Sequence, residues 1–408
     1  MDKIVIVGTG QAGVQAAISL RDEGYDGALT MVGEEPGWPY QRPPLSKAYL
    51  LGKMDDEGIL LRAPSLYADN RITVIDGVRV DAIERLERWV RLSDGRILDY
   101  DHLVLATGAR QRPLPASGAE LEGVLDLRTL HDAKALKARL DGGAKGAVVV
   151  GAGFIGLEFA AVARSLGVAV TVVEIADRVM ARALTAEMST FFQRKHEEWG
   201  VDFRFGVGLR EIRGQTRVQE VALGDGSFVD ADLVLVGIGV MPNLELAEAA
   251  QLTVGNGIVV DELLRTSDPA ISAIGDVALH PNRFSGTGPV RLESVQNAAD
   301  QGRLLAGRLM GKAKPYDSVP WFWSDQGDLK LQMAGLSTGH DQVVVRGDPA
   351  AGAFSTLCFK AGRLIAAESV NKPADHIAAR RLIQANAPLT AEQAADEATP
   401  LKVHIPAA

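Results

Sequence analysis

The sequence predicts an α/β chain in which two Rossmann-like, dinucleotide-binding units precede a smaller α+β domain. Two glycine-rich turns predict the two units, since each comes directly after a short apolar run and before a helix-like stretch. A change of pattern near residue 320, where short alternating strands replace the strand–helix alternation, predicts the third domain. At 408 residues the chain is long enough for two or three domains.

The first glycine-rich turn occupies residues 8–13, after the apolar run 3–7. We expect Gly8 to make the tight turn, Gly10 to let the backbone approach a pyrophosphate and Gly13 to allow close strand–helix packing. The phosphates would lie at the positive end of the following helix. Glu34 comes soon after the predicted strand 28–32 and about 20 residues after Gly13, where an acid suits a ribose 2′-hydroxyl.

The second turn repeats this pattern after the apolar run 147–150. Gly151, Gly153 and Gly156 take the three glycine positions, and Glu174 closes the predicted strand 169–173 as the acid. One glycine turn alone is a weak signal, but two complete units predict two dinucleotides. We interpret these as a flavin and a nicotinamide.

The elements between and after the turns alternate as an α/β fold requires. In the first unit, a loop stiffened by prolines (38–47) leads to a short helix-like stretch (47–51). Strands follow at 72–80, 89–92 and 101–106, with a hairpin turn at 93–96. In the second unit, a hairpin is expected from two strands: 218–224 and 228–236. The chain then returns to the first unit with strands and a helix: 257–261, 266–276 and 290–311. Four strands and a helix make the last domain: 329–334, 343–346, 356–360, 363–368 and 374–387.

Composition narrows the functional classes. A net charge of -9 argues against nucleic acid or an anionic membrane as a partner. No apolar run reaches transmembrane length, and the predicted first strand leaves no room for a signal peptide, so we expect a cytoplasmic protein. The single cysteine, Cys358, excludes the flavoenzymes that relay electrons through a disulfide, and is expected to be buried and structural. The histidines lack metal-ligand spacing, so no metal site is assigned.

The order of motifs is similar to that of the flavoproteins related to glutathione reductase, and within them resembles the NADH-dependent ferredoxin reductases. The matching segments are 42–47, 105–108, 156–158, 274–276 and the tryptophan-rich 320–326. The resemblance covers essentially the whole chain. It implies an FAD-binding domain of residues 1–112 and 241–319, an NADH-binding domain of residues 113–240 and a C-terminal α+β domain of residues 320–408.

The resemblance also implies residues that bind FAD. These are Ala12 in the first turn, Glu34 on the adenosine ribose, Val80 beside the adenine, Arg128 on the pyrophosphate, Asp276 on the ribityl or pyrophosphate portion, and Val295 at the isoalloxazine. An arginine suits a diphosphate as a charge-assisted donor, although Arg128 could instead form a surface ion pair. Asp276 could instead be a helix cap, but its position at the C-terminal end of a strand favours a ligand.

Three further residues carry the chemistry that the resemblance implies. Lys47 would lie near the flavin N5, with Glu158 paired to it, because a cation stabilises the charge that reduced flavin carries. The alternative is a solvated lysine and an ordinary surface glutamate. Trp323 would lie beside the flavin and the docking surface, although it and Trp321 could be core residues.

By this resemblance the chain is an NADH-dependent reductase. Hydride passes from NADH to FAD, and single electrons then pass to a [2Fe-2S] ferredoxin that serves a cytochrome P450 monooxygenase. Alternatives are a reductase for an aromatic-ring dioxygenase or for rubredoxin, an NADH oxidase, and, in another class, a signalling flavoprotein like apoptosis-inducing factor. Glu174 favours NADH over NADPH, although Arg178 and Arg182 follow closely. Basic residues expected to steer the ferredoxin are Arg303, Arg308, Lys312, Lys314, Arg380 and Arg381.

Overall fold

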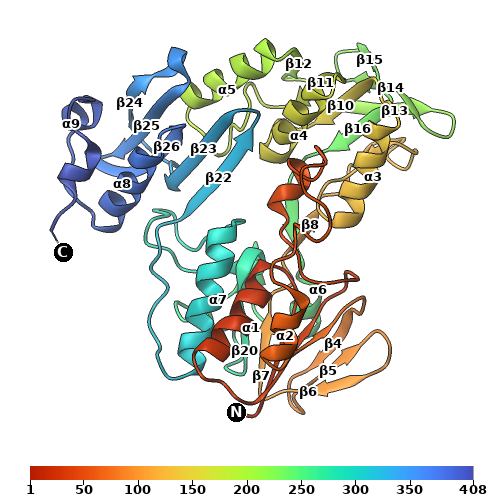
Figure 1. The fold of residues 1–408 in the computed structure, drawn as a ribbon, viewed down its shortest axis with the longest axis vertical. Helices are drawn as coiled ribbons and strands as arrows, with labels where there is room; N and C mark the ends of the chain where they lie inside the picture. The colour runs from red at the N-terminus through yellow and green to blue at the C-terminus, as the bar shows by residue number, and fades with distance from the viewer. Residues whose placement is uncertain (408) are drawn as a thin grey trace. The chain divides into compact units, whose positions relative to one another are not determined.

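The computed structural model describes residues 1–407, and its fold is the predicted α/β architecture with an added α+β domain (Figure 1). The chain forms two compact units. Unit 1 contains residues 1–41, 56–110 and 241–322, and unit 2 contains residues 42–55, 111–240 and 323–408. No helix within residues 1–407 combines the length and the apolar character needed to cross a bilayer.

Unit 1 is built on a five-stranded parallel sheet of order β20-β7-β1-β2-β3. Its strands are β1 (Lys3–Val7), β2 (Ala28–Val32), β3 (Ile72–Ile75), β7 (His102–Leu105) and β20 (Ile271–Ala273). Helix α1 (Gln11–Asp22) lies beside α7 (Val295–Leu309), as Figure 1 shows. The two helix backbones approach so closely that a β-carbon on Gly302 of α7 would lie 2.9 Å from the Ala16 nitrogen.

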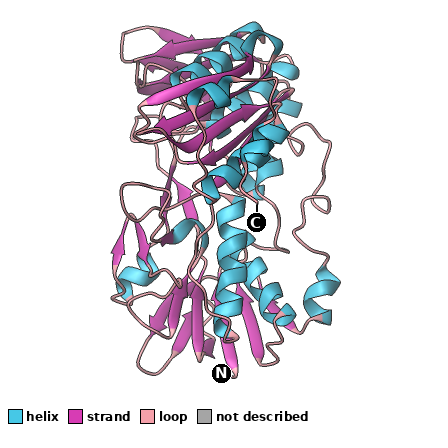
Figure 2. Cartoon of the chain, turned by 90° about the vertical axis from the view of Figure 1, so that its left-hand side faces the viewer, coloured by secondary structure: helices cyan, strands magenta, loops and turns pink. Residues whose placement is uncertain are grey.

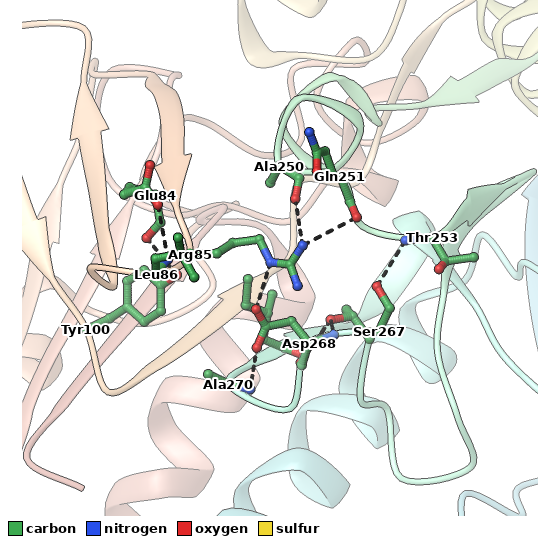
Figure 3. A network of polar contacts seen from close by, with 12 residues as sticks. Glu84, Arg85, Leu86, Tyr100, Ala250, Gln251, Thr253, Ser267, Asp268 and Ala270 are labelled. Atoms are coloured by element: carbon green, nitrogen blue, oxygen red, sulfur yellow. Dashed lines mark hydrogen bonds and ion pairs between the residues drawn. The ribbon is translucent and has the colours of Figure 1, made fainter.

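Smaller elements complete unit 1. They are α2 (Pro64–Asp69), the antiparallel sheet of β4 (Val80–Glu84), β5 (Trp89–Leu92) and β6 (Ile97–Asp99), helix α6 (Glu245–Ala249), strands β18 (Val254–Gly255), β19 (Gly257–Val259) and β21 (Ala278–Leu279), and the 3₁₀ turn η2 (Gly275–Val277). The Arg85 guanidinium joins the turn after β4 to the returning segment, since it donates to Asp268 and to the Ala250 carbonyl (Figure 3). This contact adds to the pairing of β20 with β7, which also joins the two parts of unit 1.

Unit 2 repeats the parallel arrangement, with the sheet order β12-β11-β10-β16-β9. The strands are β9 (Val124–Leu125), β10 (Gly146–Val150), β11 (Ala169–Glu174), β12 (Val201–Phe205) and β16 (Leu233–Val236), and the helices are α3 (Leu130–Asp141), α4 (Phe154–Ser165) and α5 (Ala186–Glu198). A separate sheet contains β13 (Leu209–Gly214), β14 (Val218–Leu223) and β15 (Phe228–Asp230). The predicted strand 228–236 is therefore two strands in two sheets.

The C-terminal part of unit 2 is an antiparallel sheet of order β22-β23-β26-β25-β24. Its elements are β22 (Trp321–Gln326), β23 (Leu329–Gly335), β24 (Gln342–Asp348), η3 (Pro349–Ala351), β25 (Ala353–Lys360), β26 (Arg363–Val370), α8 (Pro373–Gln384), α9 (Ala391–Ala395) and η4 (Leu401–His404). Cys358 is fully buried in β25, as expected, and burial raises the pKa of its thiol. Figure 2 distinguishes the helices in cyan from the strands in magenta.

The chain passes between the units at both ends of residues 42–55, within β8 (Ala109–Gln111), at the start of β17 (Val240–Pro242) and within β22. The predicted helix at 47–51 is wrong. The 3₁₀ turn η1 (Pro43–Ser46) ends there instead, because Lys47 has backbone angles of φ -132° and ψ -100°, outside the helical region.

Candidate active site: two nucleotide-binding turns and a buried lysine–glutamate pair

The first glycine turn, between β1 and α1, has the geometry that a pyrophosphate site requires. Gly8 has φ +119°, and a β-carbon there would lie 2.1 Å from the Ala106 carbonyl oxygen. A β-carbon on Gly13 would lie 2.0 Å from the Gly8 carbonyl oxygen. A β-carbon on Gly10 would have no atom within 4 Å. The outer glycines therefore serve packing, whereas the middle glycine leaves open space at the backbone.

The second turn, between β10 and α4, repeats this arrangement in unit 2. Gly151 has φ +101°, and its β-carbon would lie 2.5 Å from the Gly237 carbonyl oxygen. A β-carbon on Gly156 would lie 2.4 Å from the Gly151 carbonyl oxygen, whereas one on Gly153 would meet nothing within 4 Å. The same division between packing glycines and an open middle glycine therefore occurs twice.

The helices that follow the turns begin without a side-chain cap. Gly10 is the N-cap of α1 and Gly153 is the N-cap of α4, and neither helix has an acid in its first turn. By contrast, the Ser294 hydroxyl caps α7 and the Thr185 hydroxyl caps α5. Uncapped N–H groups at the positive end of a helix favour an anion. Both turns therefore fit the pyrophosphate of a dinucleotide.

Glu174 lies beside the second turn, at the end of β11. Its carboxylate accepts hydrogen bonds from the backbone nitrogens of Ala152 at 2.8 Å and Ala176 at 2.9 Å. Arg178 points elsewhere, since it donates to the Leu184 and Ala181 carbonyls and to the Ser189 hydroxyl. Its guanidinium is therefore engaged within the protein, in competition with any binding of a 2′-phosphate.

Unit 1 brings together several of the residues expected to bind FAD. Ala12 lies in the first turn of α1, and a β-carbon on Gly275 would be 2.9 Å from the Ala12 β-carbon, so the turn holding Asp276 packs against α1. The Gly275 N–H donates to Gln301 of α7 at 2.7 Å. Val295 is the first residue of α7.

Two of the remaining residues also belong to unit 1. Glu34 is 71% exposed, and its carboxylate lies 4.0 Å from the Arg79 guanidinium. Val80 is buried at the start of β4. Arg128 and Lys47 belong to unit 2, where the Arg42 guanidinium donates to the Arg128 carbonyl at 2.5 Å.

The Lys47 ammonium forms an ion pair with Glu158, at 2.9 Å between Nζ and Oε1. The Lys47 side chain is 18% exposed and that of Glu158 is 3% exposed. The Pro43 carbonyl accepts a second hydrogen bond from Nζ at 3.3 Å. An ammonium has three N–H donors, and these contacts use two of them. Burial of a carboxylate without a paired cation would be costly, so the pair accounts for the position of Glu158 in α4.

Two hydroxyl groups complete the surroundings of Glu158. Ser46 donates to Oε2 at 2.5 Å and Ser324 donates to Oε1 at 2.7 Å. Both serines lie within the segments 42–47 and 320–326 that carry the family resemblance, but the sequence indicated no role for either. Gln326 and His196, which continue the hydrogen bonds behind Ser324, were also not predicted. The alternation of polar residues at 324 and 326 in a strand was the available signal.

Trp323 lies in β22 between Phe322 and Ser324, and is half-buried. The alternation of a strand points its side chain to the face opposite that of Ser324. No group of three or more potential metal ligands occurs within residues 1–407.

The prediction that Arg308 belongs to an exposed basic patch is wrong. Its guanidinium donates to the Ser272 hydroxyl at 2.6 Å, and burial lowers its pKa to about 10. It faces the sheet because α7 turns this position toward β20, which a count of charges along the helix does not reveal. Arg303 is 58% exposed and Lys312 is 69% exposed, each with an acidic neighbour, Asp300 and Glu23.

Comparison with known proteins agrees with this geometry. Residues 2–302 match the family of pyridine nucleotide-disulphide oxidoreductases, and residues 321–405 match the reductase C-terminal family. Rhodocoxin reductase of Rhodococcus erythropolis is 53% identical over 403 residues, which cover 98% of this chain and 94% of that protein.

Two solved structures are also similar over nearly their whole length. A ferredoxin reductase for a CYP system from Rhodopseudomonas palustris has a TM-score of 0.97 at 49% identity, covering 100% of both chains. Putidaredoxin reductase, in its covalent complex with putidaredoxin, has a TM-score of 0.95 at 43% identity, covering 99% of this chain and 98% of that one. The chain therefore belongs to the pyridine nucleotide-disulphide oxidoreductases, and within them to the ferredoxin reductases that use FAD and NAD(P)H.

Proposed function

We propose that this protein oxidises NADH and reduces a [2Fe-2S] ferredoxin that serves a cytochrome P450 monooxygenase in the cytoplasm. The observation that carries the proposal is the presence of two dinucleotide turns in one chain, each with an open middle glycine before an uncapped helix. The relative that serves a CYP system supports the P450 as terminal enzyme. Reductases of ring dioxygenases and of rubredoxin remain the alternatives.

The first turn, in unit 1, is the proposed site for FAD. Gly8, Gly10 and Gly13 shape the turn for the pyrophosphate, and Ala12 follows at the start of α1. The other proposed contacts are Glu34 for the ribose, Val80 for the adenine, Arg128 and Asp276 for the phosphate and ribityl portions, and Val295 for the ring. When bound, FAD supplies an acceptor for the hydride of NADH and a donor of single electrons to the ferredoxin.

The second turn is the proposed site for NADH. The open space at Gly153 and the N–H groups of α4 suit the pyrophosphate. Each Glu174 oxygen accepts one backbone hydrogen bond and has a further lone pair with which to accept from a ribose hydroxyl, and the charge of the carboxylate repels the 2′-phosphate of NADPH. The internal contacts of Arg178 support this preference.

Lys47 is proposed to hold positive charge at the flavin, where negative charge develops during reduction. Glu158 offsets the burial of this ammonium and orients it, and Ser46 and Ser324 orient Glu158 in turn. Trp323 is proposed to lie at the flavin and the ferredoxin docking surface.

The proposal is tested by reconstituting electron transfer with purified components. The holoenzyme and NADH are mixed with a [2Fe-2S] ferredoxin or a rubredoxin, and carrier reduction is followed by absorbance. The expected result is rapid turnover with the ferredoxin, and oxidation of a P450 substrate only when the P450 is added. Reduction of ferricyanide with neither carrier reduced would overturn it. Efficient reduction of rubredoxin alone would favour the rubredoxin reductase instead.

A further inference from the structure

A chain of buried hydrogen bonds leads from Glu158, the ion-pair partner of Lys47, to His196. Ser324 donates to Glu158 at 2.7 Å, Gln326 Nε2 donates to the Ser324 hydroxyl at 3.2 Å, and His196 Nε2 lies 2.8 Å from Gln326 Oε1. The side chains of Ser324, Gln326 and His196 are each 0% exposed. All members of the chain belong to unit 2.

Three separate elements supply these residues. Ser324 and Gln326 are two residues apart in β22, so they share one face of the strand. Glu158 comes from α4 and His196 from α5. These hydrogen bonds therefore link β22 of the C-terminal sheet to α4, which follows the second dinucleotide turn, and to α5.

The donors and acceptors have only one consistent direction. A carboxylate paired with an ammonium only accepts, so the Ser324 hydrogen points to Glu158. The Ser324 oxygen then accepts from the amide nitrogen of Gln326, which turns the amide oxygen toward His196. The imidazole must donate from Nε2. Burial lowers the pKa of His196 to about 4, so the ring is neutral and carries one hydrogen.

The imidazole of His196 forms a hydrogen bond through only one of its two nitrogens. Nδ1 is buried and has no hydrogen-bond partner among the described residues. An unsatisfied buried acceptor costs about 1–3 kcal/mol, which an apolar side chain would avoid. Retention of an imidazole with a single hydrogen bond is consistent with a use for that one donor.

We propose that Ser324, Gln326 and His196 are positioning residues, which hold the Glu158 carboxylate and through it the Lys47 ammonium in the orientation used for flavin reduction. The inference rests on the proposed role of Lys47. The chain acts by orientation: the two oxygens of Glu158 are each held by a hydroxyl, Ser46 on Oε2 and Ser324 on Oε1. Loss of the Ser324 hydroxyl leaves Oε1 with the Lys47 ammonium as its partner, so that the carboxylate and the ammonium are oriented less strictly.

The test measures flavin reduction by NADH in a stopped-flow instrument, over a range of NADH concentrations. Ser324→Ala is expected to lower the limiting rate on the order of tenfold, since a hydrogen bond to a charged group is lost. The NADH concentration for half-saturation should stay unchanged. Gln326→Met and His196→Leu should lower the rate in the same direction but less. His196→Gln should recover much of the loss seen in His196→Leu, because its amide also offers an N–H.

A matched control separates positioning from folding. Ser355 is also a 0% exposed serine in the same sheet, and its hydroxyl forms hydrogen bonds with the Ser369 hydroxyl at 2.8 Å and the Asp375 carboxylate at 3.2 Å, apart from the hydrogen bonds between Glu158 and His196. Ser355→Ala should lower the thermal midpoint about as much as Ser324→Ala without changing the limiting rate. The visible circular dichroism of the oxidised flavin should change in Ser324→Ala and not in Ser355→Ala.

Combination with Lys47→Ala distinguishes failure of this inference from failure of the proposed function. If the chain acts through Lys47, Ser324→Ala adds no further loss of rate to Lys47→Ala. Full additivity, or a wild-type rate in both Ser324→Ala and Gln326→Met, would overturn the positioning role. If Lys47→Ala itself reduces at the wild-type rate, the proposed role of Lys47 fails. In that case, an altered flavin dichroism in Ser324→Ala would still support the orientation of Glu158 by Ser324, Gln326 and His196. An unaltered dichroism would overturn this orientation as well.

Discussion

Lys47 Nζ lies 2.9 Å from Oε1 of Glu158, a carboxylate that is only 3% exposed. A lysine at the end of a 3₁₀ turn thus neutralises an acid on a helix that begins more than 100 positions later in the chain. Because each charge offsets the burial of the other, removal of one partner leaves the other unpaired.

Lys47→Ala should slow flavin reduction by about a hundredfold, because the cation is proposed to act where charge develops. NADH binding should change little, since the second turn does not depend on Lys47. Stopped-flow bleaching of the flavin measures both quantities. Lys53→Ala is the matched control, because Lys53 is exposed in the same segment. A wild-type rate in Lys47→Ala would contradict the prediction and reduce Glu158 to a structural role.

Gly153→Ala and Gly156→Ala should separate binding from folding. An alanine at 153 adopts its extended backbone, φ -80° and ψ -178°, without strain and has open space around its methyl group, so the protein should fold but bind NADH more weakly. An alanine at 156 would bring its methyl group within 2.4 Å of a backbone oxygen, which should cost about 1–3 kcal/mol of stability. Thermal unfolding and NADH titration measure the two effects. Equal loss of stability in both variants would be inconsistent with this division.

Glu174→Ala should narrow the preference for NADH over NADPH by about tenfold, because it removes a charge that repels the 2′-phosphate. Arg178 should not raise NADPH affinity in the parent protein, since its donors serve the Leu184 and Ala181 carbonyls. Steady-state kcat/KM with both nucleotides measures the ratio. An equal or better efficiency with NADPH in the unaltered protein would refute the assignment of Glu174.

Acid should destabilise the protein through its buried histidines. Burial lowers the pKa of His196 and of His376 to about 4, and burial beside Arg308 lowers that of His102 to about 3, from an ordinary value of 6.5. In this pH range these histidines bind protons in the unfolded chain and stay neutral in the folded chain. The free energy of unfolding therefore falls as pH falls from 6.5 toward these values. Each histidine contributes up to about 1.4 kcal/mol per pH unit in this window.

Thermal midpoints measured across this pH range test the prediction. His196→Gln should make the decline shallower, whereas His131→Gln, at an exposed position, should leave it unchanged. An identical slope in His196→Gln and the unaltered protein would show that His196 does not contribute.

Ferredoxin reduction should fall as salt rises, because exposed charges are screened beyond about 10 Å at 0.1 M ionic strength. NADH–ferricyanide turnover needs no protein docking and should change much less. Among the basic residues, Arg303, Lys314 and Arg381 are exposed, whereas Arg308 is committed to Ser272. Arg381→Ala should therefore flatten the salt dependence more than Arg308→Ala. A flat response, or a parallel decline of both activities, would favour apolar docking near Trp323.

The sequence by itself determined both dinucleotide units, because glycine is required where a β-carbon would strike a carbonyl oxygen, as at Gly8, Gly13, Gly151 and Gly156. These constraints act within one strand–turn–helix and leave a local signature. Four of the five strands of the C-terminal sheet were also predicted from their alternating patterns, and β24, β25 and β26 pair with neighbours along the chain. Strand β22 and the pairing of β23 with β26 were not predicted.

Only the tertiary structure decided which distant side chains meet. Nothing local indicates that Arg308 turns inward, that residues 42–55 pack in unit 2, or that 228–236 divides between two sheets. Likewise, the partners of Glu158 come from η1 and β22, and the link from Ser324 through Gln326 reaches α5. Hydrogen bonds of this kind depend on distances between elements far apart in sequence, which residue type and spacing do not specify. Close packing sets those distances once the whole chain has folded.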